Sequence, residues 1–423
     1  MNQLPVHPAL RALTTSRRGA FRLTLCAVGV LSVTLATALA SPPAPPPSLC
    51  VEESASCATV ATSEKIKWHP GHYLGIGYFL ALPATMTSPN NMTAAIAEIA
   101  SMPTIKGVLV GFDWGALETT EGTYNFALLD QLLAACQASG KRLVIVVGWA
   151  AYSTGSVDYN ISQGRFPAYL RDTYNGIYGD KTVNQVDAKI WLTAIMDRYI
   201  ALHQALARRY DTHPYFEGVA TGESYTAMTS PDYSRAAILA QYKRLVTALE
   251  AIWVHTNVFV EANGMDGGTP AEQDLFAHML AHRMVLSGPD IRADSDINHF
   301  ERIYTGLPTY GGVDYRGQIA HGDECQSPNL GGNHTPTAAT LSPSLLLQTI
   351  YAKAVTLQSS YIFWERKTYG NSQGGTDNDI FWDTAPSGYV NNHPTIKEFL
   401  SQSESAIPVV TTPPRNYSGV DTN

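Results

Sequence analysis

Eight short apolar segments alternate with longer helical patterns between residues 70 and 400, and this alternation is the strongest constraint on the fold. The predicted strands are residues 73–80, 107–112, 143–147, 218–220, 258–261, 284–287, 318–320 and 361–364. Most of them are continuous apolar runs, as expected of strands that are covered by helices. Each intervening helical segment carries one apolar stripe, for example Ile238, Tyr242, Leu245, Leu249 and Ile252.

Eight strand–helix units in about 330 residues predict an α/β fold, a (β/α)8 TIM barrel with long βα loops. The alternative, an open doubly wound sheet, usually has a glycine-rich phosphate turn after its first strand. Here Gly75 and Gly77 lie within the predicted first strand and no third glycine follows. Residues 151–186 and 370–378 are the predicted long loops, and such loops on the catalytic face of a barrel usually shape the substrate cleft.

The first forty residues have the pattern of an export signal. Four arginines, the last three of them in residues 17–22, precede an apolar run that ends in Ala38-Leu39-Ala40, a pattern that signal peptidase cuts. The arginine pair at residues 17–18 resembles a twin-arginine signal, and an uncleaved membrane anchor is the alternative. We therefore predict a signal peptide (1–40), a Pro/Ala/Ser-rich linker (41–65), the barrel (66–405), a disordered tail (406–423), and a secreted or periplasmic location.

The charge of the chain excludes two classes of partner. Its formal net charge is −8, and residues 1–40 contain four arginines and no acidic residue, so the remainder carries 24 basic and 36 acidic residues. A body this acidic is unsuited to nucleic acid or to stable association with an anionic membrane. The cysteines have no zinc-site spacing, and Cys136 occupies a helical core position typical of a buried free thiol.

Carboxylates and large aromatic residues stand at the ends of the predicted strands, where a barrel places its chemistry. These residues are Asp113-Trp114, Trp149, Glu223, Tyr225, Asn263, Asp290, Asp323-Glu324 and Trp364-Glu365. The sequence has neither an H-E-x-x-H metal motif nor a G-x-S-x-G serine elbow. Two carboxyl groups among aromatic rings suit the hydrolysis of an acetal, in which one protonates the leaving oxygen and the other attacks or stabilises the anomeric carbon.

Several segments resemble the retaining glycoside hydrolases of clan A. Residues 209–224 (RYDTHPYFEGVATGES) resemble that clan's fourth βα unit, and residues 112–126 (FDWGALETTEGTYNF) resemble the segment after its second strand. Phe363-Trp364 resembles the last strand, and Ser287-Gly288-Pro289-Asp290 resembles the turn after strand 6 in some members. The similarity spans about residues 70–400, and no numbered family is assigned.

The resemblance implies roles for two glutamates. Glu223, at the end of strand 4, would be the acid/base, and Glu324, at the end of strand 7, would be the nucleophile. Asp323 and Glu365 are the alternatives for the second carboxylate, and alternation of side chains would turn only one of Asp323 and Glu324 into the barrel mouth. The clan usually has an asparagine before the acid/base, where this chain has Gly222.

Seven further residues are predicted to contact the substrate. They are Asp113, Trp114, Trp149, Tyr225, Asn263, His321 and Trp364. Trp364 would form the floor of the subsite for the cleaved sugar, and Asn263 would supply the hydrogen bond lost with the missing asparagine. Structural alternatives apply as well: Asp113 would cap a βα loop, and His321 would be a packing residue. Glu217, Glu118 and Glu121 are interpreted as structural.

These inferences together predict an exported glycosidase that cleaves a poly- or oligosaccharide by retaining double displacement, with no metal or organic cofactor. A non-catalytic carbohydrate-binding barrel is the main alternative, in which Gly222 marks lost chemistry. A barrel with other chemistry, such as a metal-dependent deacetylase or a lyase, is a weaker alternative.

Overall fold

The computed structural model describes residues 66–76, 89–152, 155–180, 185–224, 229–265, 268–288, 291, 299–325, 343–366, 396–417 and 420–421. The predicted signal peptide and linker lie outside these residues. Within the described ranges, no helix is both long enough and apolar enough to cross a membrane.

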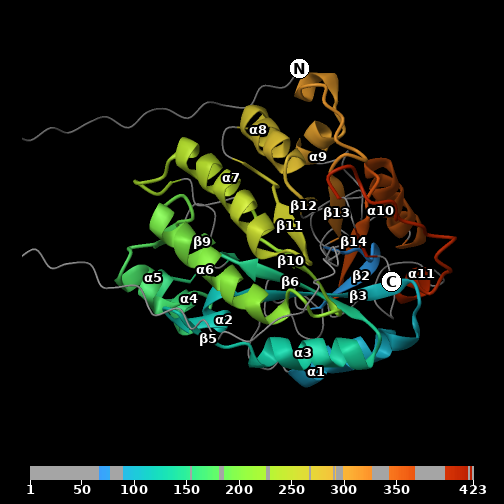
Figure 1. The fold of residues 1–423 in the computed structure, drawn as a ribbon, viewed down its shortest axis with the longest axis horizontal. Coiled ribbons are helices and arrows are strands. Elements are labelled where there is room, and N and C mark those ends of the chain that lie inside the picture. The colour runs from blue at the N-terminus through green and yellow to red at the C-terminus, as the bar shows by residue number, and fades with distance from the viewer. Residues whose placement is uncertain are drawn as a thin grey trace, which may run out of the picture. The chain divides into compact units, whose positions relative to one another are not determined.

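Eight parallel strands form a closed barrel, which confirms the predicted (β/α)8 fold (Figure 1). In barrel order they are β2 (Gly71–Ile76), β3 (Ile105–Asp113), β6 (Arg142–Gly148), β10 (Phe216–Ala220), β11 (Asn257–Glu261), β12 (Val285–Gly288), β13 (Ala320–Cys325) and β14 (Tyr361–Arg366). The order follows the chain, and β14 pairs with β2 to close the ring. Each strand overlaps its predicted position, but β13 runs five residues beyond the predicted end of strand 7 at residue 320.

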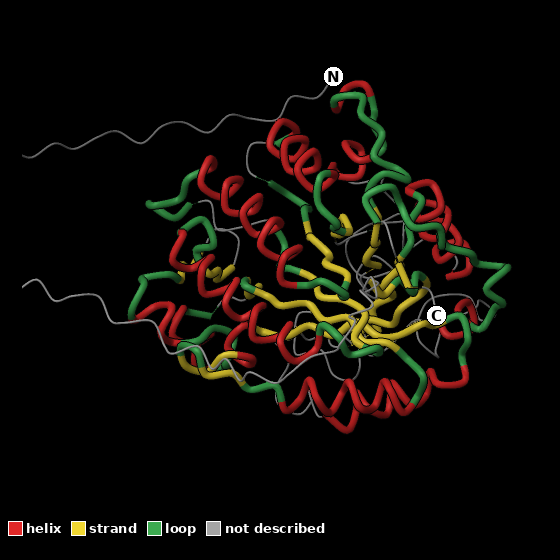
Figure 2. The backbone as a smooth tube through the Cα atoms, in the orientation of Figure 1, coloured by secondary structure: helices red, strands yellow, loops and turns green. Residues whose placement is uncertain are grey.

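Helices surround this barrel on its outside (Figure 2). The longer ones are α1 (Pro89–Glu98), α3 (Ala127–Ala138), α6 (Thr193–Tyr210), α7 (Arg235–Ile252), α8 (Thr269–Leu280) and α10 (Pro343–Leu357). The shorter ones are α2 (Trp114–Leu117), α4 (Val157–Ser162), α5 (Ala168–Asp172), α9 (His299–Tyr304) and α11 (Ile396–Leu400), with 3-10 turns η1 (Ile99–Ser101) and η2 (Pro308–Tyr310). The predicted stripe of α7 is buried at Ile238, Tyr242, Leu245 and Leu249.

Alternation along the strands divides the buried side chains into two layers. The inner layer fills the barrel, with Tyr73, Leu109, Val144, Val146, Ala220, Phe259, Val285, Ala320, Tyr361 and Phe363. The intervening residues of the same strands pack outward against the helices. Because successive side chains point to opposite faces, the parity of each inner residue identifies which strand-end side chains face the barrel mouth.

The described residues between 150 and 188 form a small domain-like insertion after β6. Three antiparallel strands, β7 (Ala150–Tyr152), β9 (Gln185–Ala188) and β8 (Ile177–Asp180), build a sheet, with α4 and α5 between β7 and β8. A second small hairpin, β4 (Glu118–Thr120) with β5 (Thr123–Tyr124), follows α2. The sequence predicted a long loop here without this internal sheet.

The C-terminal segment is packed, which corrects the prediction of a disordered tail from residue 406. Ile407 and Tyr417 are buried, and the Tyr417 ring lies 4.9 Å from that of Trp68. The Trp68 indole donates to the Thr411 carbonyl at 2.8 Å, and β15 (Val420–Asp421) pairs with β1 (Ile66–Lys67). The polar composition of the segment predicted disorder, but these few anchoring contacts hold it against the N-terminal end of the barrel.

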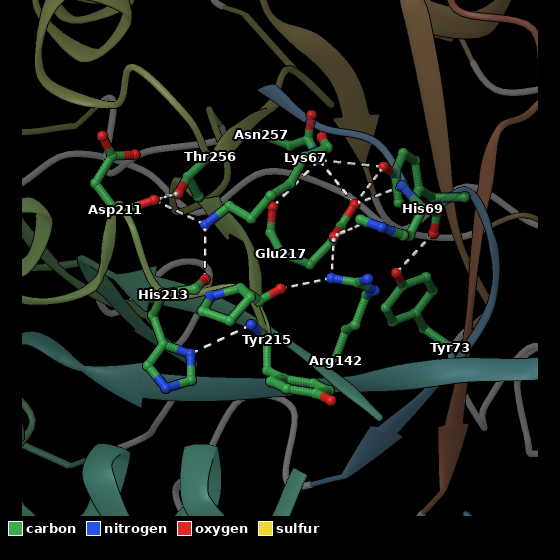
Figure 3. Close-up of polar contacts among 12 residues, drawn as sticks. Lys67, His69, Tyr73, Arg142, Asp211, His213, Tyr215, Glu217, Thr256 and Asn257 are labelled. Carbon is green, nitrogen blue, oxygen red and sulfur yellow. Dashed lines mark hydrogen bonds and ion pairs between the residues drawn. The ribbon is translucent and has the colours of Figure 1, made fainter. Parts of the chain in front are cut away.

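A buried carboxylate organises that N-terminal end (Figure 3). Glu217 is fully buried and accepts hydrogen bonds from the backbone and ring of His69, from Asn257 and from Tyr361, at 2.8–3.0 Å. Arg142 Nη1 lies 3.7 Å from Glu217 Oε2. The interpretation of Glu217 as structural fits this place, because the N-terminal end of a (β/α)8 barrel serves stability rather than chemistry.

Candidate active site

Glu223 lies three residues past the end of β10, at the C-terminal mouth of the barrel, and its carboxylate accepts hydrogen bonds from two side chains. Asn263 donates its Nδ2 to Glu223 Oε2 at 2.5 Å. The Tyr152 hydroxyl, from β7, also hydrogen-bonds to Glu223; burial first, and then the charge and hydrogen bond of Glu223, raise the pKa of Tyr152 well above its usual value. The position of the Glu223 carboxylate is therefore fixed from two sides.

Two further buried carboxylates lie near Glu223. Asp187 in β9 and Glu261 at the end of β11 are both fully buried, and their charges, with that of Glu223, contribute to the raised pKa values of Tyr152 and Tyr242 after burial itself. Gln185 donates to Asp187 Oδ1 at 2.8 Å. The sequence analysis did not identify Tyr152, Asp187 or Glu261. The insertion that carries Tyr152 and Asp187 has no periodic signal. Glu261 is the last residue of a predicted strand, and this position was the signal that could have identified it.

The seventh strand turns Glu324, rather than Asp323, toward the barrel mouth. Ala320 belongs to the inner layer, and a side chain on Gly322 would meet the inner rings of Phe259 and Phe363. Alternation therefore directs Glu324 inward and Asp323 outward. Glu324 is 3% exposed.

The outward residues of β13 form a buried polar network. His321 Nδ1 lies 3.3 Å from both Asp323 Oδ1 and Ser359 Oγ, and Ser359 also donates to Asp323. Burial would lower the pKa of His321, but the charge and hydrogen bond of Asp323 raise it above the usual value. With Glu301 of α9, His321 and Asp323 bring three potential metal-ligand atoms within 4.8 Å of one another.

This location makes His321 a packing residue that faces away from the barrel mouth. His321 is fully buried on the outer face of β13, with its ring 4.6 Å from that of Tyr304 on α9. This is the position that the structural alternative describes.

The three predicted substrate-binding tryptophans are also buried on the outer side of the barrel, which corrects that prediction. Trp114, Trp149 and Trp364 have no exposed surface. Trp149 packs edge-on against Tyr199 of α6 and Tyr242 of α7. The parity of each strand end, rather than the residue type, decides whether an aromatic ring faces the mouth.

The other two rings have structural partners of their own. Trp114 donates to Glu118 Oε2 at 2.9 Å, and Trp364 donates to His72 Nδ1 at 3.0 Å and packs on Phe399 of α11. Each indole N–H is therefore paired within the fold, as a buried indole requires.

Asp113, the last residue of β3, has the inward parity of Leu109 and is half-buried. Burial raises its pKa to about 7, and Arg165, on the loop between α4 and α5, opposes this shift. Asp113 occupies the N-cap position of α2 without a capping hydrogen bond from its side chain. The Asp113 carboxylate therefore does not cap the βα loop, which was the alternative role predicted for it.

Gly222 is explained by packing. A Cβ atom on this residue would lie 2.9 Å from the Trp149 ring, which is held between Tyr199 and Tyr242. The asparagine typical of clan A would not fit here, and Asn263 instead contacts the Glu223 carboxylate. Tyr225, Asp290 and the side chain of Glu365 lie outside the described residues.

Comparison with known proteins agrees with the (β/α)8 fold. Residues 87–253 match the glycosyl hydrolase family 42, described as beta-galactosidase. No curated protein matches the chain in sequence.

Solved structures show the same fold at low sequence identity. The catalytic domain of beta-amylase from Paenibacillus polymyxa is 8% identical, with a TM-score of 0.53 over 81% of this chain and 99% of that one. The cold-adapted beta-galactosidase from Rahnella sp. R3 is 13% identical, with a TM-score of 0.50 over 82% of this chain and 58% of that one. Endo-glycoceramidase II from Rhodococcus sp. is 12% identical, with a TM-score of 0.50 over 80% of each chain.

The matched segment contains β3, β6 and β10 and the residue proposed as acid/base, Glu223. The chain is thus similar to the clan A (β/α)8 glycoside hydrolases in fold and, over residues 87–253, in sequence, which supports a retaining glycosidase without assigning one family.

Proposed function

We propose that this protein is an exported retaining glycosidase that hydrolyses O-glycosidic bonds in an oligo- or polysaccharide. The observation that carries the proposal is the pair Glu223 and Glu324, which approach the barrel mouth from β10 and β13, the fourth and seventh strands. Clan A enzymes use carboxylates from these two strands. The family match over residues 87–253 includes Glu223, and the role of Glu324 rests on its position on the seventh strand.

In the proposed mechanism Glu324 attacks the anomeric carbon while Glu223 protonates the departing glycosidic oxygen. This step breaks the glycosidic bond and forms a glycosyl ester on Glu324. Glu223, now ionised, takes a proton from water, which attacks the anomeric carbon and releases Glu324. Asn263 and Tyr152 would act as positioning residues, because both hydrogen-bond to Glu223.

The comparisons support a carbohydrate as the substrate class. The family match is to beta-galactosidases, and the structural relatives are a beta-galactosidase, a beta-amylase and an endo-glycoceramidase, so a carbohydrate is the proposed partner. The signal-like N-terminus supports export, to the cell exterior or the periplasm, where polymeric and oligomeric sugars are available.

The test is turnover on a panel of 4-nitrophenyl glycosides and the corresponding disaccharides, with the β-galactoside first. We expect Glu324→Gln to reduce kcat by at least about 100-fold on both kinds of substrate. Glu223→Gln should reduce turnover less on 4-nitrophenyl glycosides, because their good leaving group needs little protonation. Glu121→Gln, on the exposed turn between β4 and β5, is the control and should keep full activity.

The carbohydrate-binding barrel gives a different result. It would bind sugar but show no turnover in the unmodified protein, so neither glutamine variant would have an activity to lose. Inversion of anomeric configuration, followed by NMR on the first product, would contradict double displacement and make Glu324 a general base.

A further inference from the structure

Two opposite charges at the barrel mouth are near each other but not paired. Asp113 and Arg165 interact electrostatically, yet among the described residues neither side chain makes a hydrogen bond or an ion pair within 4.0 Å. Arg165 is 8% exposed, and its Nε–H is buried with no hydrogen-bond partner in the described part of the chain.

The backbone that carries Arg165 is closely fixed to the catalytic face. The Arg165 carbonyl accepts a hydrogen bond from Gly115 N at 3.1 Å, and Arg165 N donates to the Asn160 carbonyl at 3.1 Å. Gly115, in α2, has no room for a side chain, because a Cβ atom there would lie 2.5 Å from the Gly164 carbonyl oxygen. The turn therefore packs directly on the segment that begins at Asp113, and the backbone of Arg165 is fixed beside that segment.

An unsatisfied buried guanidinium donor is costly, and natural structures rarely retain one without a reason. A direct ion pair with Asp113 would satisfy it, but the structure keeps the two groups apart. A ligand with neighbouring hydroxyl groups would bridge the Asp113 carboxylate and the terminal N–H groups of Arg165, because a hydroxyl donates to a carboxylate and accepts from a guanidinium.

We propose that Asp113 and Arg165 together bind two neighbouring hydroxyl groups of a neutral sugar, in a subsite next to the cleaved bond. This inference rests on the proposed function for its substrate class and adds Arg165, which the sequence did not indicate. Asp113 pairs with Gly148 of β6, and β6 lies beside β10, so Asp113 is two strands from the segment carrying Glu223. At about 4.8 Å per strand this is roughly 10 Å, the scale of an adjoining sugar unit.

The surrounding charge favours a neutral sugar over an acidic one. Glu223, Asp187, Glu261 and Glu324 lie at the same end of the barrel, and Arg165 already faces one carboxylate, Asp113. A uronic acid would bring another negative charge into this group, and like charges repel.

The experiment measures binding by saturation-transfer NMR on the full chain with Glu223→Gln, which prevents turnover. The probes are galactose, glucose, mannose and xylose, with galacturonate and glucuronate as acidic counterparts. We expect at least one neutral sugar to bind, and Arg165→Ala and Asp113→Ala each to weaken that binding by about 10-fold or more. Arg165→Lys keeps the charge without the planar fork and should have an intermediate effect.

Arg171→Ala is the matched control, because Arg171 lies in the same insertion but is exposed and pairs with Asp158 and Asp172. It should leave sugar binding unchanged. Thermal unfolding establishes that each variant is folded, and the lysine variant keeps the test valid if Arg165→Ala does not fold.

Three results would overturn the inference: unchanged binding in both Arg165 variants, stronger binding of the uronates, or no neutral sugar bound by the parent protein. These results are distinct from failure of the proposed function. Sugar binding that depends on Arg165 and Asp113 without any turnover in the protein carrying Glu223 would uphold the subsite and reject the glycosidase.

Discussion

The packing around residue 222 explains why a glycine occupies this position. Its missing side chain leaves room for the Trp149 ring, which Tyr199 and Tyr242 hold from the helix side. We predict that Gly222→Ala costs about 1–3 kcal/mol of unfolding free energy, because the ring cannot move away from a new Cβ. Gly148→Ala is the control, since its Cβ would be 3.6 Å from the nearest atom, an ordinary contact. Equal urea midpoints for the two variants would contradict this explanation.

Glu217 should matter for stability and not for turnover. Burial alone would raise its pKa, but the hydrogen bond and charge of His69 hold the pKa below the usual 4.5. Glu217→Ala should cost about 3–5 kcal/mol, because it leaves several buried donors without their acceptor. Glu404→Gln, an exposed partner of Lys106 on the same face, should cost less than about 1 kcal/mol. A large loss of activity in folded Glu217→Ala would place this residue in the chemistry instead.

Sequence reasoning identified strand-end carboxylates better than strand-end aromatics. A carboxylate is costly to bury without partners, and Asp323 shows the exception, because it is buried on the outer face of β13 with His321 and Ser359 as partners. A tryptophan is equally stable against the outer helices, and Trp114, Trp149 and Trp364 all pack there. The roles of Tyr152 and Asp187 could not be predicted, because contacts between distant segments bring them to Glu223.

At the level of elements, the C-terminal segment is a structural part of the barrel. Tyr417 is buried against Trp68, and Asn416 donates to the carbonyls of His282 and Met284. We predict that Tyr417→Ala lowers the unfolding free energy by about 3–5 kcal/mol, as expected of a buried aromatic ring. Tyr159→Ala, which removes a 51% exposed ring, should change it by no more than about 0.5 kcal/mol. Equal unfolding free energies of the two variants would instead support a disordered C-terminal tail.

The observed elements also show why the ends of a strand were harder to predict than its presence. The seventh strand was predicted over residues 318–320 from its apolar residues, but β13 spans Ala320–Cys325 and includes the polar residues of the site. Ladder pairing with β12 and β14 extends it. Functional polar residues within a strand interrupt the apolar signal on which its prediction depends.

At the level of the whole molecule, the repeated strand–helix alternation was sufficient to predict the closed barrel. The same burial that builds this fold makes stability depend on pH. Burial lowers the pKa of His72 to about 4 and that of His203 to about 3. Trp364 donates to His72 Nδ1 and Trp253 donates to His203 Nδ1. Protonation of either imidazole would therefore place its new Nδ1–H against the indole N–H, with no acceptor between them.

These shifts predict loss of stability in mild acid. Both folded-state pKa values lie below the unfolded value of about 6.5, so the unfolded chain binds more protons as the pH falls. Between about pH 6.5 and 4 each histidine should remove up to about 3 kcal/mol, whereas His321, with its raised pKa, acts in the opposite direction. Urea unfolding across this range tests the slope, and the double variant His72→Gln, His203→Gln should flatten it. An unchanged slope would show that other groups control acid unfolding.

The most direct test of the central claim is to identify the residue that carries the covalent intermediate. A 2-deoxy-2-fluoro glycosyl fluoride of the best-hydrolysed sugar would trap the glycosyl ester, and peptide mass spectrometry would locate it. The proposed double displacement predicts the label on Glu324, with none formed by Glu324→Gln. A label on Asp323, Glu261 or Glu365, or time-dependent turnover with no label at all, would contradict the assignment of Glu324 as nucleophile.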